Sequence, residues 1–176
     1  MEKEKELRLI KGAQAGDREA LTLLWDAITP KLFGYLVNTT RNKTLAEDIL
    51  QTTWLKAING LPSYTWRGVG IQAWLFAIAR NECRMHWRKS GKETALETLE
   101  YDPKIETEEK IREKIWVDQV LSYLSADDQE ILRLRFIADL PLNEIAKILN
   151  LNFVNVRVRI HRALGRARKY INSQKI

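Results

Sequence analysis

The chain has 176 residues, 45% of them hydrophobic, with only 8 Gly and 4 Pro, a composition typical of a folded and mainly helical protein. Its 29 Lys and Arg against 23 Asp and Glu leave a net charge of +6, which favours a polyanionic partner. One cysteine excludes an internal disulfide, and the lack of a long apolar run or signal-peptide core predicts a cytoplasmic protein without membrane insertion.

The first third of the chain predicts four helices. An amphipathic helix over residues 4–15 is followed by Asp17, which is expected to cap a second helix. Pro30 is expected to open a third helix, because its missing N–H is no loss in a first helical turn. Thr44 and Glu47 have the spacing of a capping box, which predicts that a fourth helix starts there.

A loop, a basic helix and an acidic tether follow. The Pro and Gly content of residues 61–70 indicates a loop, after which a fifth helix runs from about residue 71 to a basic end near residue 89. Residues 92–108 carry many acids and few large apolar groups, which is typical of a linker. We therefore place a first domain at residues 1–91 and a second at residues 109–176.

The second domain predicts two helices, at about 111–124 and 126–137, followed by a helix-turn-helix. Pro141 suits the first turn of a short helix, and Asn150 and Asn152 tolerate the backbone of a tight turn. A long basic helix comes next. The fold class is therefore all-α, with two small helical domains joined by an acidic linker, the second a helix-turn-helix.

The last helix is unusually basic. Residues 151–176 contain seven Lys or Arg and no Asp or Glu, and the helix also carries an apolar stripe. This pattern is typical of a recognition helix that enters a DNA groove. A solvated basic face is the alternative interpretation of the arginines alone.

The loop before the fifth helix carries a second unusual group, Tyr64, Trp66 and Arg67. Aromatic rings stack on unpaired bases and guanidinium groups hold phosphates, so this group is a candidate site for single-stranded nucleic acid. The alternative is that Trp66 packs back on the core while Arg67 is solvated.

Several motifs appear in one order along the chain: GDREAL from Gly16, TLAEDILQTTWLKAI from Thr44, AWLFAIARNECR from Ala73, LSADDQEILRLRF from Leu124, and EIAKILN followed by VRVRIHRAL. Together they resemble an extracytoplasmic-function (ECF) sigma factor, a small two-domain promoter-recognition subunit of bacterial RNA polymerase. The resemblance runs from about Gly16 to Arg168, nearly the whole chain.

The resemblance implies three sets of site residues. A helix that docks on a coiled coil of the largest polymerase subunit matches Glu47, Asp48, Gln51 and Trp54. A reader of the minus-10 element, which captures a flipped base of the non-template strand, matches Tyr64, Trp66, Arg67, Arg80, Asn81, Arg84 and Arg88. A reader of the minus-35 element matches Asn152, Phe153, Asn155, Arg157, Arg159 and Arg162.

The partners implied are core RNA polymerase, promoter DNA as duplex and as melted single strand, and an anti-sigma factor wedged between the two domains. No cofactor, metal or small-molecule substrate is implied. The chain departs from the family at Val154 and Asn155, where Gly-Thr is usual, at Val158, where Ser is common, and at Met85, where Asp is common. These departures leave the promoter sequence open.

Two other functions fit parts of the sequence. A dimeric helix-turn-helix repressor or activator that acts without core polymerase explains the second domain, but gives the docking motif and the aromatic loop no role. An enzyme would need more than Cys83 and His86, one helical turn apart, and the distant His161. Metal sites take three or four ligands and a nucleophilic thiol needs an oriented base, so we expect no catalytic residue.

Overall fold

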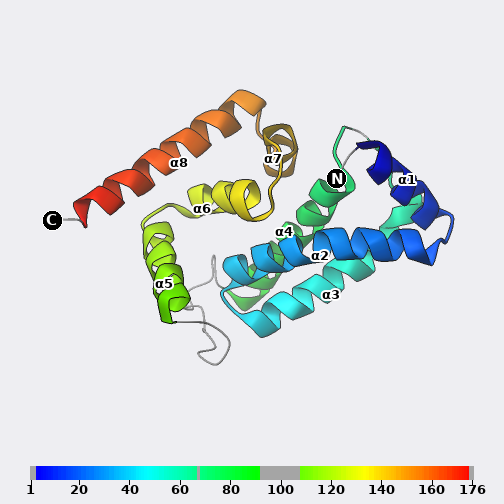
Figure 1. Ribbon diagram of the computed structural model, residues 1–176, viewed down its shortest axis with the longest axis horizontal. Helices are drawn as coiled ribbons and strands as arrows, with labels where there is room; N and C mark the ends of the chain where they lie inside the picture. The colour runs from blue at the N-terminus through cyan, green and yellow to red at the C-terminus, as the bar shows by residue number, and fades with distance from the viewer. Residues whose placement is uncertain (1–2, 67, 92–107, 175–176) are drawn as a thin grey trace.

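The computed structural model describes residues 3–66, 68–91 and 108–174, and all regular elements in these ranges are helical (Figure 1). This confirms the predicted all-α class. In chain order the elements are α1 (Lys3–Gln14), α2 (Arg18–Thr40), α3 (Lys43–Gly60), the 3₁₀ turn η1 (Leu61–Ser63), α4 (Ile71–Ser90), α5 (Glu108–Ser122), α6 (Ala126–Leu132), the π-helical turn η2 (Arg133–Ile137), α7 (Leu142–Leu149) and α8 (Phe153–Ser173).

We call the described residues up to Gly91 the N-terminal half and those from Glu108 onward the C-terminal half. The predicted linker over residues 92–108 lies outside the described residues except for Glu108, where α5 begins. Within the described ranges, none of the helices has both the length and the apolar character that crossing a lipid bilayer requires.

The second and third predicted helices are one helix in the structure. Asp17 caps α2 as expected, since its Oδ1 accepts from the N–H groups of Glu19 at 2.9 Å and Ala20 at 3.3 Å. Pro30 lies inside α2 instead of opening a new helix. An internal proline removes one backbone hydrogen bond, but the apolar face runs on across it, with Ile28 before and Leu32 after both buried. Burial of this continuous face holds the helix together.

The predicted start of the fourth helix was displaced by two residues. Arg41 ends α2 in the left-handed conformation, with φ 55°. Asn42 is then the N-cap of α3, because its side chain accepts from the Leu45 N–H at 2.8 Å. Thr44 is therefore already helical, and the Thr44–Glu47 capping box does not form. A short polar residue directly after a left-handed turn caps the helix before the threonine is reached.

Two details of the C-terminal half also differ from the prediction. The helix expected over residues 126–137 is α-helical only to Leu132 and finishes as the π-helical turn η2. Pro141 has extended backbone and is the N-cap of α7, one position before the first turn where it was expected. Between them Asp139 has φ 54°, so a left-handed residue redirects the chain from η2 into α7.

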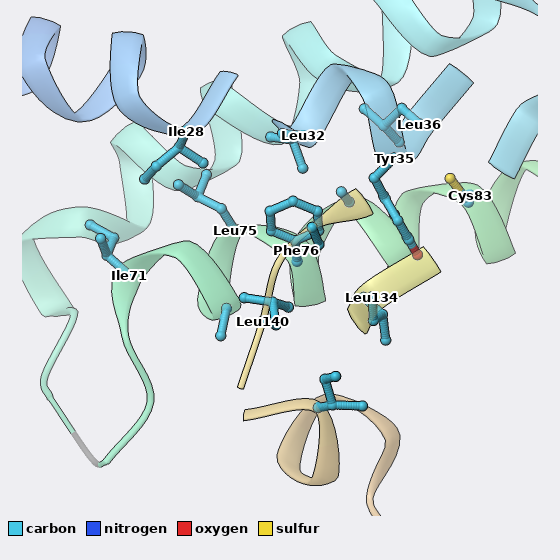
Figure 2. Packing of buried hydrophobic residues seen from close by; sticks show 14 of the residues in the cluster. Ile28, Leu32, Tyr35, Leu36, Ile71, Leu75, Phe76, Cys83, Leu134 and Leu140 are labelled. Atoms are coloured by element: carbon cyan, nitrogen blue, oxygen red, sulfur yellow. The ribbon is translucent and has the colours of Figure 1, made fainter. Parts of the chain in front are cut away.

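The apolar core continues from one half of the chain into the other. Tyr35 of α2 and Phe76 of α4 meet edge to face with ring centroids 5.3 Å apart. Leu134 of η2 and Leu140 from the following turn belong to the same buried cluster (Figure 2). Accordingly α2 packs on η2, and α4 packs on α7. The two halves therefore pack directly against each other and share one apolar core.

Candidate nucleic-acid interface

A left-handed residue builds the turn of the helix-turn-helix. Asn150 ends α7 with φ 53° and ψ 46°, a conformation that Asn adopts more readily than most residues. The Leu151 N–H donates to the Ala146 carbonyl at 2.8 Å. Asn152 then caps α8, because its Oδ1 accepts from the Asn155 N–H at 2.7 Å. These contacts fix where α8 begins and which face it turns outward.

The polar face of α8 is open to solvent. Val156 and Ala163 are fully buried on the opposite face, where α8 packs against α6 and α7. All six residues that the sequence predicted for the minus-35 reader are exposed: Asn152, Phe153, Asn155, Arg157, Arg159 and Arg162. The structure therefore leaves the whole predicted set accessible to solvent, with Arg157 and Arg159, two positions apart in the helix, on opposite flanks of the buried stripe.

Acidic side chains of α6 lie beside two of the basic residues of α8. Arg159 lies 3.6 Å from Asp127, with the two side chains 45% and 83% exposed, and Arg166 pairs with the buried Asp128. An ion pair as exposed as the first contributes roughly 0–1 kcal/mol. Arg159 can therefore leave Asp127 for a phosphate or a base at little cost.

The loop between η1 and α4 encloses an aromatic cavity. The rings of Tyr64 and Trp74 are 4.9 Å apart at 47°, and the Tyr64 hydroxyl donates to the Val69 carbonyl at 2.8 Å. Burial, followed by the charges of Glu6 and Glu144, raises the pKa of Tyr64 to about 12, which keeps the phenol protonated. The cavity measures about 440 Å³, within the range of small-ligand pockets.

The remaining aromatic residue of the loop is less exposed than the prediction required. Trp66 is half-buried against the core cluster, and Lys3 of α1 lies over its ring, 5.6 Å from the centroid. This is the packing that the alternative interpretation of Trp66 described. Arg67 lies outside the described residues.

Helix α1 holds both ends of this loop, a contact that sequence reasoning missed. The Gln14 side chain donates to the carbonyls of Leu61 at 2.9 Å and Tyr64 at 2.8 Å. The carboxylate of Glu6 accepts from the Ile71 N–H at 2.7 Å at the start of α4. Burial is the main cause of a raised pKa at Glu6. The one available signal was a polar residue on the buried face of an amphipathic helix.

The residues of α4 that were predicted for the minus-10 reader divide into two groups. Asn81, Arg84 and Arg88 are exposed, as a DNA-tracking face requires. Arg80 is turned toward the C-terminal half, and its Nε donates to Glu130 of α6 at 3.1 Å. The structure thus places Arg80 in an ion pair between the two halves, which the sequence pattern did not indicate.

The predicted docking residues of α3 divide in the same way. Glu47, Asp48 and Gln51 are exposed, whereas Trp54 is only 4% exposed. The Trp54 ring lies 4.6 Å from that of Trp25, and its Nε1 donates to the Thr29 hydroxyl at 3.1 Å. Trp54 is therefore a core residue, and the sequence missed four exposed apolar residues on α2 and α3: Leu23, Trp25, Leu55 and Ile58.

Cys83 and His86 lie in different environments on α4. Cys83 is buried in α4 and burial raises the pKa of its thiol to about 12, which keeps it protonated at neutral pH. His86, one turn further along, is exposed. Within the described part of the chain, no three His, Cys, Asp or Glu side chains are grouped closely enough to hold a metal ion.

Comparison with known proteins decides the family. Residues 24–93 match the family described as sigma-70 region 2, and residues 114–166 match sigma-70 region 4. The chain is 33% identical over 174 residues to the ECF RNA polymerase sigma factor SigD of Mycobacterium tuberculosis, covering 90% of this chain and 80% of SigD. The chain belongs to the ECF RNA polymerase sigma factors.

Two further comparisons place this sigma factor among its relatives. It is 27% identical over 166 residues to the ECF RNA polymerase sigma factor BldN of Streptomyces coelicolor, covering 90% of this chain but only 62% of BldN. The sigma factor RpoE, solved in complex with the anti-sigma factor NepR from Bartonella quintana, shares its fold with a TM-score of 0.71 at 24% identity. That match covers 86% of this sigma factor and 96% of RpoE.

Proposed function

We propose that this sigma factor brings core RNA polymerase to a two-element promoter and promotes melting of the downstream element. Residues 1–91 dock on the polymerase and read the minus-10 element, residues 109–176 read the minus-35 element, and residues 92–108 connect them. The observation that carries the proposal is the set of exposed arginines on α8, held in place by a helix-turn-helix with a capped start.

The minus-35 element is read in the major groove by α8. A side chain such as Arg159 that makes a two-pronged contact with guanine discriminates against other bases by roughly 1–3 kcal/mol. Arginines that contact only phosphate add affinity without sequence preference, and each contributes about 0.9 to the salt dependence of binding.

The minus-10 element is held as a single strand beside the loop and α4. The aromatic cavity between Tyr64 and Trp74 supplies ring faces for an unpaired base, and stacking contributes roughly 1–3 kcal/mol per base. Arg84 and Arg88 follow the phosphates along the exposed face of α4.

Polymerase docks on the exposed face of α3. Glu47, Asp48 and Gln51 supply its polar contacts, and a groove lined by Trp25, Phe33 and Leu50 lies beside them. An anti-sigma factor regulates the chain, as NepR is bound to RpoE. Because the two halves share a core, a partner wedged between them would first have to separate them, and one that holds the packed arrangement from outside fits better.

A pull-down of core RNA polymerase tests this function. We expect stoichiometric binding by the wild type and loss of binding by Asp48→Arg, which reverses an exposed charge near the start of α3. The matched control is Glu19→Arg, which reverses another exposed charge near the start of α2, at the opposite end of the α2–α3 pair (Figure 1). A folded wild type that fails to bind, and that forms a homodimer by native mass measurement, would favour the dimeric helix-turn-helix regulator.

A further inference from the structure

The surface around the loop and α4 is covered by the chain's own C-terminal half. At the N-terminus of α4 the Gly70 N–H donates to Glu144 of α7 at 2.8 Å. The ammonium group of Lys147 donates to the Gly68 carbonyl at 3.0 Å. Lys147 and Ile148 also line the aromatic cavity. Helix α7 therefore closes one side of the pocket in which an unpaired base would stack.

A second contact pairs Arg80, a cation of α4 that was predicted to bind DNA, with an acid of the C-terminal half. Glu130 of α6 lies between two donors of the N-terminal half, and its Oε1 accepts from the Tyr35 hydroxyl at 2.8 Å and from Arg80 Nε at 3.1 Å. The Arg80 and Glu130 side chains are only 22% and 17% exposed. Salt screens a pair this shielded much less than it screens pairs on the surface.

We propose that the C-terminal half is a built-in competitor for single-stranded promoter DNA. Glu130 accepts from the Nε of Arg80, a group that a phosphate would bind, and α7 closes one side of the aromatic cavity. We call this packing the closed arrangement. The inference rests on the proposed role of the loop and α4 in reading the minus-10 element.

The closed arrangement is selective. The arginines of α8 and the residues Glu47, Asp48 and Gln51 of α3 stay exposed in it, so duplex DNA and polymerase have access. At the single-strand site, by contrast, Arg80 is paired and the aromatic cavity is partly covered. The Arg80 Nε that donates to Glu130 is not available to a phosphate, and the negative charge of Glu130 disfavours a phosphate at the remaining N–H groups of the same guanidinium. The apparent affinity for single-stranded DNA is therefore the intrinsic affinity multiplied by the fraction of molecules that are open.

Fluorescence anisotropy with random-sequence DNA tests the competition in the full chain. The probes are a labelled single strand of about 12 nucleotides and a duplex of the same length. We expect Glu130→Gln combined with Glu144→Gln to bind the single strand roughly tenfold tighter and the duplex with a much smaller change. The control pair is Glu82→Gln, which removes an acid from α4 that pairs with Lys56 inside the N-terminal half, and Glu19→Gln on the exposed surface of α2.

The outcomes separate the two proposals. Equal gains for single strand and duplex, or equal gains in the control variants, would reduce the effect to a change of net charge and overturn the closed arrangement as a competitor. Loss of single-strand binding by Tyr64→Ala with Trp66→Ala supports the loop as the binding site. If those two substitutions left single-strand affinity unchanged in the Glu130→Gln, Glu144→Gln variant, the proposed role of the loop would itself be wrong.

The native thiol gives a second readout that needs no variant. Cys83 is 1% exposed, and the charged groups that most affect its pKa, Glu130 and Arg133, belong to the C-terminal half. We expect saturating single strand to accelerate alkylation of Cys83 several-fold, and saturating duplex to leave the rate unchanged. A single strand that binds without accelerating alkylation, or that slows it, would contradict opening.

Discussion

The two DNA-facing regions of this sigma factor carry similar sequence signals but differ in access. Helix α8 presents Arg157, Arg159 and Arg162 to solvent, whereas Arg80 of α4 is paired with Glu130 and the aromatic loop is bordered by α7. In the sequence, both regions consist of arginines on an amphipathic helix. The difference arises from acidic residues that are distant in sequence. A basic sequence pattern therefore shows that a helix could bind DNA, whereas tertiary packing decides whether its arginines are accessible to DNA.

The largest expected effect tests whether the loop region is covered through a shared core. Phe76→Ala removes a fully buried ring that packs between the halves. Such a truncation lowers the free energy of unfolding by about 3–5 kcal/mol. We expect denaturant unfolding, followed by tryptophan fluorescence and by helical circular dichroism, to remain one coincident transition at a lower midpoint. Two separated transitions in the wild type would show that the halves are independent.

A matched pair of arginine substitutions sharpens the comparison at the level of duplex DNA. Arg159→Ala should weaken binding to a duplex upstream element by roughly 1–3 kcal/mol and relax base preference, because Arg159 is exposed on α8. Arg80→Ala should leave duplex binding nearly unchanged. Titrations against a randomised duplex pool measure both. A loss by Arg159→Ala that is uniform across sequences would make Arg159 a phosphate contact.

The smallest expected effect concerns Glu6 of α1, whose carboxylate accepts from the Ile71 N–H where the loop meets α4. The pKa of Glu6 is raised, chiefly by burial, so the charged carboxylate is disfavoured in the folded state. Its stability contribution is therefore fully present below the unfolded pKa of about 4.5 and is lost as pH rises through the folded value. Relative to Glu6→Gln, the wild type should lose unfolding free energy over that window. An unchanged difference between pH 4 and pH 8 would contradict the shift.

Local signals predicted the elements and the helix-turn-helix well. The Asp17 cap, the turn at Asn150 and the basic helix after it depend on residues close together in sequence, and the structure has all three. The failures have local causes too. Pro30 stayed within a helix because the apolar face was continuous across it, and Asn42 capped α3 before Thr44 could.

The contacts between the halves could not be predicted from the pattern. Tyr35 and Glu130 are 95 positions apart, and Gly70 and Glu144 are 74 apart. No propensity or periodicity relates residues at such separations. The burial of Trp54 was not predicted for a similar reason, since its neighbours Trp25 and Thr29 come from a different helix. Sequence identified which side chains could act, and only the packing showed which are occupied.

The unbroken course of α2 through Pro30 has a mechanical consequence. The helix has 23 residues, a rod of about 34 Å at 1.5 Å per residue. Phe33, in the groove beside α3, and Tyr35, the partner of Glu130, lie two residues apart on this rod. A partner that rotates or shifts α2 on filling the groove must also move the Tyr35 hydroxyl. Any resulting coupling is reciprocal: if polymerase docking favours strand capture, strand capture favours docking to the same degree.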